Sequence, residues 1–253
     1  MLRVDGVTHR FHGVPALNDV SLSVTDGGIT GLIGPNGSGK STLFNIISGI
    51  LTPDTGTISI DGLPLPKGRP MAVARAGLAR TFQIPRVAPR MTVLENLLLA
   101  RQANRAAARS DSKGRSPRTK RRQSSLQACW EMARELDLGH VANTPAGSLS
   151  GGQLKLLSLG MALLCEPKIL LLDEPVAGVN SIIIDRIAEM LRKRRDSGLA
   201  ILLIEHNLGL VTDLCDEVWV LDVGELIAHG KPSAVSRDPK VEAAYLGNRG
   251  VQA

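Results

Sequence analysis

The chain has 253 residues, of which 43% are hydrophobic and 21% charged, so it can bury a sizeable core within one large domain or a domain with a sub-domain. Its three cysteines are far apart and form no CxxC pair, which argues against a disulfide framework or a zinc site and favours a reducing cytoplasm. The first residues do not form a signal peptide, and no apolar run approaches the roughly 18 residues that a membrane span needs. We therefore expect a soluble protein that can still dock on a membrane partner.

The formal net charge of +6 comes from one segment, residues 101–122. Nine Lys and Arg side chains there face one Asp, a local charge of +8, so the rest of the chain is slightly acidic. Because Ser, Gly and Pro accompany these charges and large apolar residues are missing from its centre, the composition favours a solvated, mobile insertion. A phosphate-rich partner, such as lipid headgroups, is the weaker alternative. Nucleic acid is weaker still, because no aromatic residue interleaves the charges for base stacking.

The first half of the chain begins with about 30 residues that alternate as strands do, interrupted by turn residues. The elements predicted after them are a strand at 29–33, a helix at 41–50, a strand at 57–60, and helices at 93–99 and 126–138 on either side of the basic insertion.

The second half alternates helices with short aliphatic runs of the kind found in buried parallel strands. Its predicted elements are a strongly apolar helix at 154–164, a strand at 169–172, an amphipathic helix at 182–195, a strand at 200–204, and a hairpin of 218–221 with 225–228.

Strands and helices that alternate in both halves predict an α/β fold with a mostly parallel sheet, into which an all-helical lobe is inserted. The predicted division is a single domain over 1–253, with subdomains. Their boundaries are 1–83 and 165–230 for the core, 84–164 for the helical lobe with a basic insertion at about 101–125, and 231–253 for a C-terminal tail.

A glycine-rich stretch, GPNGSGKS at residues 34–41, matches the phosphate-binding pattern GxxxxGK followed by Ser or Thr. It follows a predicted strand and opens a predicted helix, as the pattern requires. The glycines let backbone N–H groups turn toward phosphate oxygens, and the helix N-terminus adds its positive dipole. Lys40 is expected to reach the β- and γ-phosphates, and the Ser41 hydroxyl to ligate Mg²⁺. The predicted nucleotide-binding residues of this stretch are Gly34, Asn36, Gly37, Ser38, Gly39, Lys40, Ser41 and Thr42.

Two carboxylates, Asp173 and Glu174, end the aliphatic run at 169–172. A buried strand delivers Asp173 at its carboxyl end, where the ligands of parallel sheets collect, and there it can hold Mg²⁺ through water. Glu174 is placed to polarise an attacking water. The pair could instead cap the following helix, but Pro175 comes next, and capping does not explain the aliphatic strand before it.

The sequence LSGGQ at Leu149–Gln153 is identical to the signature of ABC ATPases and precedes Asp173 by the spacing of that family. TFQ at residues 81–83 resembles the Q-loop, and AGVN at residues 177–180 resembles the D-loop. His206 resembles the switch histidine, and Phe11 lies where the family places an aromatic ring on adenine. The chain therefore resembles ABC ATPases over nearly its whole length. The resemblance implies a P-loop core of the RecA-like type with an N-terminal antiparallel β subdomain.

The same resemblance implies that the chain is an ATPase. Glu174, His206 and Gln83 would be catalytic, Mg²⁺ would be held by Ser41, Gln83 and Asp173, and Phe11 would stack on ATP. Signature residues of this family contact the nucleotide held by a second copy of the chain, so isolated monomers would bind ATP but hydrolyse it poorly. The signature residues concerned are Ser150, Gly151, Gly152 and Gln153.

Further segments resemble the ATP-binding subunits of branched-chain amino acid importers, with urea importer subunits as close relatives. These segments are GLARTFQ at 77–83, MTVLENL at 91–97, AGVN at 177–180, IEH at 204–206 and EAAYLG at 242–247. The chain departs from the wider family where Leu154-Lys155-Leu156-Leu157 replaces the usual arginines after the signature. It also has Gly160-Met161-Ala162-Leu163 where Ala-Arg-Ala-Leu is common. These departures leave the phosphate contacts intact and concern the packing of the signature helix and the identity of the solute.

The expected partners are a second ATP-binding subunit in a head-to-tail homo- or heterodimer, integral membrane permeases and, indirectly, an extracytoplasmic solute-binding protein. The expected place is the cytoplasmic face of the membrane, and no nucleic-acid partner is expected. The solute could be a branched-chain amino acid, a related small polar solute, or urea or an amide. An ABC ATPase that works without a membrane is disfavoured because the chain has neither a long coiled coil nor two cassettes. A degenerate regulatory module is disfavoured because the predicted catalytic residues are intact.

Overall fold

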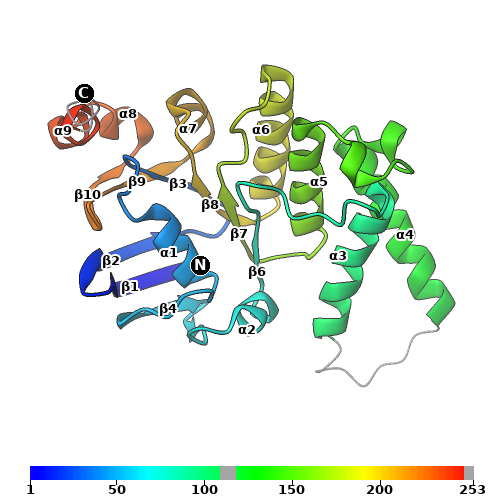
Figure 1. The fold of residues 1–253 in the computed structure, drawn as a ribbon, viewed down its shortest axis with the longest axis horizontal. Coiled ribbons are helices and arrows are strands. Elements are labelled where there is room, and N and C mark those ends of the chain that lie inside the picture. The colour runs from blue at the N-terminus through cyan, green and yellow to red at the C-terminus, as the bar shows by residue number, and fades with distance from the viewer. Residues whose placement is uncertain (109–117, 248–253) are drawn as a thin grey trace.

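The computed structural model describes residues 1–108 and 118–247, and describes side chains outside 104–122 and 246–247. Figure 1 shows two sheets and a helical lobe. The smaller sheet is antiparallel, with its strands in the spatial order β2 (Val14–Val24), β1 (Leu2–Phe11), β4 (Thr55–Ile60) and β5 (Leu63–Pro64).

The larger sheet carries the functional loops at its strand ends. Its five strands from β9 to β6 are parallel, and only β10 runs antiparallel, in a hairpin with β9. The spatial order is β10 (Glu225–Gly230), β9 (Glu217–Asp222), β3 (Ile29–Ile33), β8 (Ala200–Ile204), β7 (Ile169–Asp173) and β6 (Leu78–Arg80).

The central strands β3, β7 and β8 are buried along almost their whole length, which explains why they read as continuous aliphatic runs. Their side chains alternate between two hydrophobic cores. Leu170 and Leu203 belong to the core shared with the helical lobe, whereas Leu171 and Leu202 belong to the core under the antiparallel sheet. Each fully buried leucine stabilises the fold by about 1.5–3 kcal/mol, so the two-sided sheet joins both cores into one unit.

Helices cover the faces of the larger sheet and build the lobe at one side of it (Figure 1). The lobe consists of α3, α4 and α5, which contact one another, together with two short 3₁₀ turns at Gly139–Val141 and Ala146–Ser148. Among the helices of the described residues, none is both long and apolar enough to cross a membrane. The helix bounds are α1 (Lys40–Ile47), α2 (Pro70–Arg75), α3 (Val93–Ala108), α4 (Arg118–Glu135), α5 (Gly151–Leu163), α6 (Ser181–Asp196), α7 (Leu208–Leu214), α8 (Pro232–Val235) and α9 (Pro239–Gly247).

The unusual residue Gly160 in α5 is explained by the packing of the lobe. A Cβ atom at this position would lie 2.4 Å from Leu136 Cδ1 and 3.2 Å from Leu97 Cδ2. Because Leu97 of α3 and Leu136, directly after α4, lie this close to the α5 backbone, a larger residue has no room unless these side chains shift. The departure from the common Ala-Arg-Ala-Leu element is therefore a packing feature of this chain.

The predicted α/β fold, with its mostly parallel sheet, antiparallel subdomain and helical insertion, is confirmed. The strand predicted at 200–204 agrees with β8 at both ends. The predicted helices exist, but the first ends earlier than predicted, at Ile47, and the other four are longer in the structure. Six numbered helices and strands were not predicted, because they are short or lack a clear hydrophobic period: β5, α2, β6, α7, α8 and α9.

The prediction of a solvated, mobile insertion over 101–122 is wrong at Arg101, which is largely buried, and helices extend into both ends of the segment. Residues 101–108 continue α3, and residues 118–122 open α4. Arg101 is 12% exposed in its side chain and forms an ion pair of 2.5 Å with Glu166. The run of alanines at 106–108 favours helix more than the charge composition suggested. The remaining part of this prediction, at 109–117, lies outside the described residues.

Candidate nucleotide-binding and catalytic site

The glycine-rich loop lies between β3 and α1, where it packs closely on other backbone. A Cβ atom at Gly34 would lie 1.9 Å from the carbonyl oxygen of Leu221, and one at Gly39 would lie 2.6 Å from the carbonyl oxygen of Ala16. Both residues also have positive φ, so the close contact and the backbone conformation each require glycine at these positions. Gly37 has a φ of +80°, yet a Cβ there would meet nothing within 4 Å. The loop thus has a backbone that suits phosphate, with open space beside Gly37.

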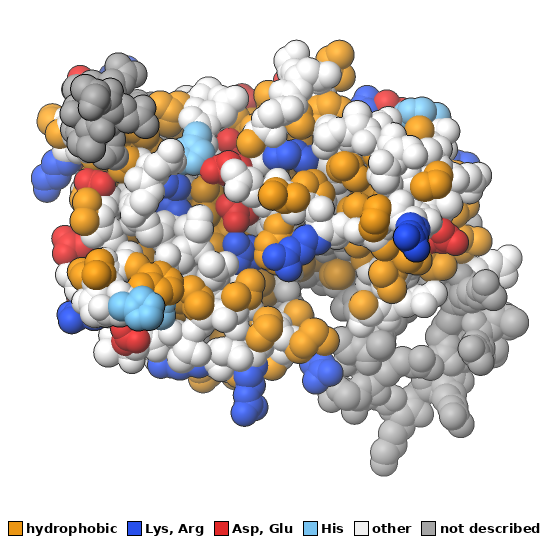
Figure 2. All heavy atoms as spheres, in the orientation of Figure 1, with side chains coloured by type: hydrophobic (Ala, Val, Ile, Leu, Met, Phe, Trp, Pro, Cys, Tyr) orange, Lys and Arg blue, Asp and Glu red, His pale blue; other side chains and the backbone are white. Residues whose placement is uncertain are grey.

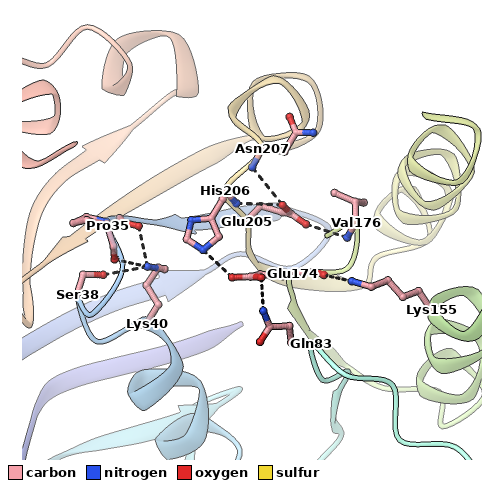
Figure 3. Close-up of polar contacts among 11 residues, drawn as sticks. Pro35, Ser38, Lys40, Gln83, Lys155, Glu174, Val176, Glu205, His206 and Asn207 are labelled. Atoms are coloured by element: carbon pink, nitrogen blue, oxygen red, sulfur yellow. Dashed lines mark hydrogen bonds and ion pairs between the residues drawn. The ribbon is translucent and has the colours of Figure 1, made fainter. Parts of the chain in front are cut away.

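Lys40 is the first residue of α1, and its buried ammonium group lies over this loop (Figure 3). Its Nζ donates hydrogen bonds to the carbonyl oxygens of Gly34, at 2.8 Å, and Pro35, at 2.7 Å. Burial lowers the pKa of Lys40, and the negative charges of Glu174 and Asp173 partly offset that effect. The lysine is therefore held where the loop and the two carboxylates meet.

Glu174, directly after β7, is fixed at both carboxylate oxygens. His206 Nε2 lies 2.7 Å from Glu174 Oε1, and Gln83 Nε2 donates to Glu174 Oε2 at 2.8 Å (Figure 3). These side chains come from the segments after β7, β8 and β6, which are neighbouring strands of the sheet. The structure therefore brings together the three residues predicted to be catalytic. Figure 2 shows acidic, basic and histidine side chains gathered in the middle of this face.

The backbone of Glu174 is strained and is held from two sides. Its φ is +48°, which is uncommon for a residue other than glycine. Its N–H donates to the carbonyl oxygen of Ile204 at 3.0 Å, and its own carbonyl accepts a hydrogen bond of 2.7 Å from Lys155 Nζ. Lys155 belongs to α5, so the helix that follows the signature contacts the candidate catalytic glutamate of its own chain.

Two residues near this site have roles that sequence reasoning missed. The first, Lys155, is half-buried, and burial lowers its pKa. The second, Glu205, is 3% exposed and accepts hydrogen bonds from the N–H groups of Val176, at 3.1 Å, and His206, at 3.1 Å. Glu205 thus joins the turns after β7 and β8. The position of Glu205, a carboxylate directly after a buried strand, could have indicated its role from the sequence. Lys155, on an apolar helix, gave no such indication.

Asp173 ends β7 and is paired with Arg80, the last residue of β6. Arg80 Nη2 donates to Asp173 Oδ2 at 2.9 Å, and the side chains are 7% and 13% exposed. Ser41, which is also a predicted Mg²⁺ ligand, is exposed at the start of α1. Sequence reasoning assigned no role to Arg80.

The signature residues begin α5, on the lobe side of the sheet, whereas α1 and the loop before it lie beyond β7 and β8 (Figure 1). Ser150 Oγ accepts from the Gln153 N–H at 3.3 Å, and Gln153 Oε1 accepts from the Ser150 N–H at 3.0 Å, so both side chains cap the helix. Gly152 is close to Ile183 Cγ1, at 3.1 Å from an added Cβ. Gly151 differs, because an added Cβ there would meet nothing within 4 Å and its φ is not positive.

Phe11 lies at the end of β1 and is 45% exposed. Its ring contacts the edge of His9, with ring centroids 4.6 Å apart. Phe11 pairs with Val14 across the turn to β2, two residues before Ala16, which touches Gly39 of the loop. The ring is therefore on the hairpin that borders the loop, and its contact with adenine stays a prediction.

Comparisons with known proteins agree with this geometry. The family described as ABC transporter matches residues 17–177, and the family described as branched-chain amino acid ATP-binding cassette transporter matches residues 225–250. The chain belongs to the ABC transporter family, as one of its ATP-binding cassettes, and is an ATPase of that family.

More particularly, the chain is 36% identical to a probable branched-chain amino acid transport ATP-binding protein, LivG, of Archaeoglobus fulgidus, over 98% of this chain and 95% of the relative. It is also 36% identical to the high-affinity branched-chain amino acid transport ATP-binding protein BraF of Pseudomonas aeruginosa, over 98% of each chain.

Among solved structures, the ADP conformation of the ATP-binding cassette MJ1267 superposes with a TM-score of 0.83, at 34% identity over 98% of each chain. A dimeric cassette, MJ0796 bound to ADP and phosphate in a post-hydrolysis state, superposes with a TM-score of 0.78. Its identity is 25%, over 92% of this chain and 99% of that one.

Proposed function

We propose that the chain hydrolyses ATP at Glu174, His206 and Gln83, and that this reaction drives the import of a small solute through separate membrane permeases. The observation that carries the proposal is the Glu174 carboxylate, whose oxygens contact His206 at 2.7 Å and Gln83 at 2.8 Å. A carboxylate held in this way beside a phosphate-binding lysine is placed to orient a water molecule toward a γ-phosphate.

In the proposed reaction a water oxygen bonds to the γ-phosphorus as the bond to the bridging oxygen of ADP breaks. Glu174 orients this water and accepts its proton, and His206 contacts the γ-phosphate and keeps Glu174 in place. The Lys40 ammonium offsets negative charge on the phosphates. The transition state is loose and spreads charge over the phosphoryl oxygens, so positioning and charge account for most of the catalysis.

The residues present fit Mg²⁺, which prefers oxygen ligands. Ser41 offers a hydroxyl, and Asp173 offers a carboxylate with Oδ2 turned toward Arg80. The Gln83 amide directs its nitrogen at Glu174, which leaves its oxygen as the end that can face a cation. Bound there, Mg²⁺ would offset charge on the β- and γ-phosphate oxygens.

The complete site is proposed to need two chains in a head-to-tail pair. Gly151 supports this, because neither its φ nor the space around it requires glycine within one chain. A backbone that must admit a phosphate from outside explains the missing side chain. The N-terminus of α5 supplies backbone N–H donors and a positive dipole for that contact. In this proposal, residues 1–83 and 165–230 form the ATP-binding core, 84–164 the signature lobe, and 231–253 a tail.

The transport role is proposed from the relatives. The named relatives are transport ATP-binding proteins for branched-chain amino acids, and the family matched at 225–250 carries the same description. We therefore propose a branched-chain amino acid or a related small polar solute as the cargo. Since no described helix can span a membrane, the chain would act as a peripheral subunit at the cytoplasmic face, bound to permeases that receive solute from a binding protein.

Reconstitution tests this proposal. The chain is co-expressed and co-purified with candidate branched-chain amino acid permeases and placed in liposomes with a matching solute-binding protein. Leucine-loaded binding protein should stimulate phosphate release several-fold, and the Glu174→Gln variant should show no stimulated release. Stimulation by urea or an amide but not by leucine would show that the transported solute is not a branched-chain amino acid. Phosphate release that needs Glu174 while no permease co-purifies would support an ABC ATPase outside transport.

A further inference from the structure

Arg80 is the last residue of β6, three residues before Gln83, and its side chain is only 7% exposed. Arginine is almost never this deeply buried unless its charge is paired. A buried ion pair is in itself weak evidence for stability, because desolvation can cost as much as the attraction returns. The position of this pair in the sheet therefore calls for a reason other than stability.

The two terminal nitrogens of Arg80 point to different elements of the core. Nη2 donates to Asp173 Oδ2 at 2.9 Å, at the end of β7. Nη1 donates to Asn45 Oδ1 at 2.8 Å and to Ser48 Oγ at 2.9 Å, on and just after the helix α1. A planar guanidinium group holds these donors in a fixed fork, which a lysine cannot reproduce. Arg80 thus joins β7 to α1.

Aromatic rings hold the guanidinium group in place. Its Cζ lies 5.5 Å from the ring centroid of Phe44, in α1, and 5.0 Å from that of Phe82. Arg86 contacts the same Phe82 ring at 4.3 Å. These distances are typical of cation–π contacts, which favour one orientation of the fork. Phe82 directly precedes Gln83, so the arginine also packs against the start of the loop that carries this residue.

The elements joined by Arg80 carry two candidate ligands of one cation. Ser41 is the second residue of α1, and Asp173 is the last residue of β7. Within the described part of the chain, the hydrogen bond and ion pair of the Asp173 side chain are both with Arg80. Because Arg80 takes Oδ2, the other carboxylate oxygen remains available on a side chain that no longer rotates.

We infer that Arg80 is a positioning residue that ties Asp173 to the helix of Ser41, so that both candidate Mg²⁺ ligands are held at a fixed separation. Arg80 contacts neither the nucleotide loop nor the Glu174 carboxylate in this arrangement. Its loss should therefore weaken the response to Mg²⁺ and spare binding of the nucleotide itself. The inference rests on the proposed ATPase site.

The test is a binding titration with fluorescent ADP, in EDTA and at increasing Mg²⁺, on the wild-type chain and Arg80→Met. In EDTA the two proteins should bind within about twofold of each other. The half-saturating Mg²⁺ concentration of Arg80→Met should rise about tenfold, the scale expected for losing a charge-assisted hydrogen bond. Arg80→Lys should lie between the two, because an ammonium group keeps the charge but loses the fork. Arg186→Met, which removes a partly exposed arginine paired with Asp137, serves as the matched control and should not differ from wild type.

A second variant covers the case in which Arg80→Met does not fold, as judged by its thermal unfolding transition. Asn45→Ala with Ser48→Ala keeps the pair with Asp173 and removes the connection to α1, together with the hydrogen bond from Ser48 Oγ to the Phe44 carbonyl. It should raise the half-saturating Mg²⁺ concentration by about fivefold, as expected for neutral hydrogen bonds. A Mg²⁺ titration within twofold of wild type in the folded variants would overturn the inference. That result would leave the proposed function standing if wild-type phosphate release still requires Glu174, whereas release independent of Glu174 would remove the proposed function itself.

Discussion

The candidate catalytic glutamate lies at the carboxyl end of β7, whereas the signature lies at the start of α5. The two differ in how far one chain completes them. Around Glu174, both carboxylate oxygens, the N–H and the carbonyl oxygen have partners within the chain. At the signature, Ser150 and Gln153 satisfy each other, while Gly151 faces open space. The difference indicates that one half of the site is assembled in the monomer and that the other half presents a surface to something outside it.

The largest expected effect comes from Glu174→Gln, which tests the assembled half. Removing the proton acceptor should lower ATP turnover by about 10³-fold, the scale of general-base catalysis. ATP binding should persist, because Lys40 and the loop are unchanged, and a dimer should accumulate on size-exclusion chromatography with ATP. Turnover near the wild-type rate would take Glu174 out of its proposed role.

A smaller effect, about 100-fold on turnover, is expected for Gly151→Asp, the scale for losing a transition-state donor. Aspartate suits the first turn of a helix, so the fold should be kept, but its charge should repel a phosphate. Mixing this variant with Lys40→Ala provides the decisive measurement. If the signature acts on the partner's nucleotide, the mixed dimer regains one intact site and part of the activity.

In the mixing experiment each variant alone is the control, and both should be nearly inactive. Activity of the mixture equal to the sum of the separate variants would mean that signature and loop act within one chain. The conclusion that the signature completes the site of a second chain would then be wrong.

Lys155→Met tests the hydrogen bond between α5 and the Glu174 carbonyl. Loss of the bond to the Glu174 carbonyl should lower turnover about tenfold, because a strained backbone loses a charged donor. The Michaelis constant for ATP should change little, since Lys155 does not contact the loop. Lys155→Arg should restore part of the rate. A variant Lys67→Met, which changes an exposed lysine elsewhere, is the control.

Lys155 also predicts a dependence of stability on pH. Burial lowers the pKa of Lys155 in the folded chain below the usual 10.5, which applies to the unfolded chain. At pH values between the folded and the unfolded pKa, the unfolded chain therefore binds more protons than the folded chain. The free energy of unfolding contributed by this group therefore rises with pH across that window. Lys155→Met should flatten this rise when denaturant unfolding is followed toward alkaline pH. An unchanged slope would contradict the burial of the charge.

The smallest effect on activity is expected for Gly160→Ala, which changes the lobe and not the site. The methyl group would collide with Leu136, at a cost of about 1–3 kcal/mol for overpacking. Part of this is offset by about 1 kcal/mol of helix propensity. The melting temperature should fall by about 2–4 °C, and binding of ATP to the core should stay unchanged. A rise in melting temperature would show that the lobe has room at this position.

Much of the fold and site could be predicted because their signals are contiguous in the chain. The loop at 34–41 and the carboxylates after β7 each combine a short pattern with the element that places it. Arg80 and Lys155 could not be assigned roles, because each acts on a different element and its partners are defined only by the packed fold. Glu205 did carry a signal, as a carboxylate directly after a buried strand, but its partners became visible only in the structure. The high charge of the basic segment led to a wrong prediction for Arg101, because this side chain is largely buried and forms an ion pair with Glu166.

The left-handed backbone at Glu174 has a consequence for how this position can change over time. Glycine or asparagine would adopt a φ of +48° at lower conformational cost than glutamate. Substitutions that relax the backbone here therefore also remove the carboxylate, so a change that lowers the conformational strain also lowers the turnover. This is a stability–activity trade-off located at a single residue. A copy of the gene released from selection for hydrolysis can lose its glutamate without a backbone penalty and still keep a cassette that binds ATP.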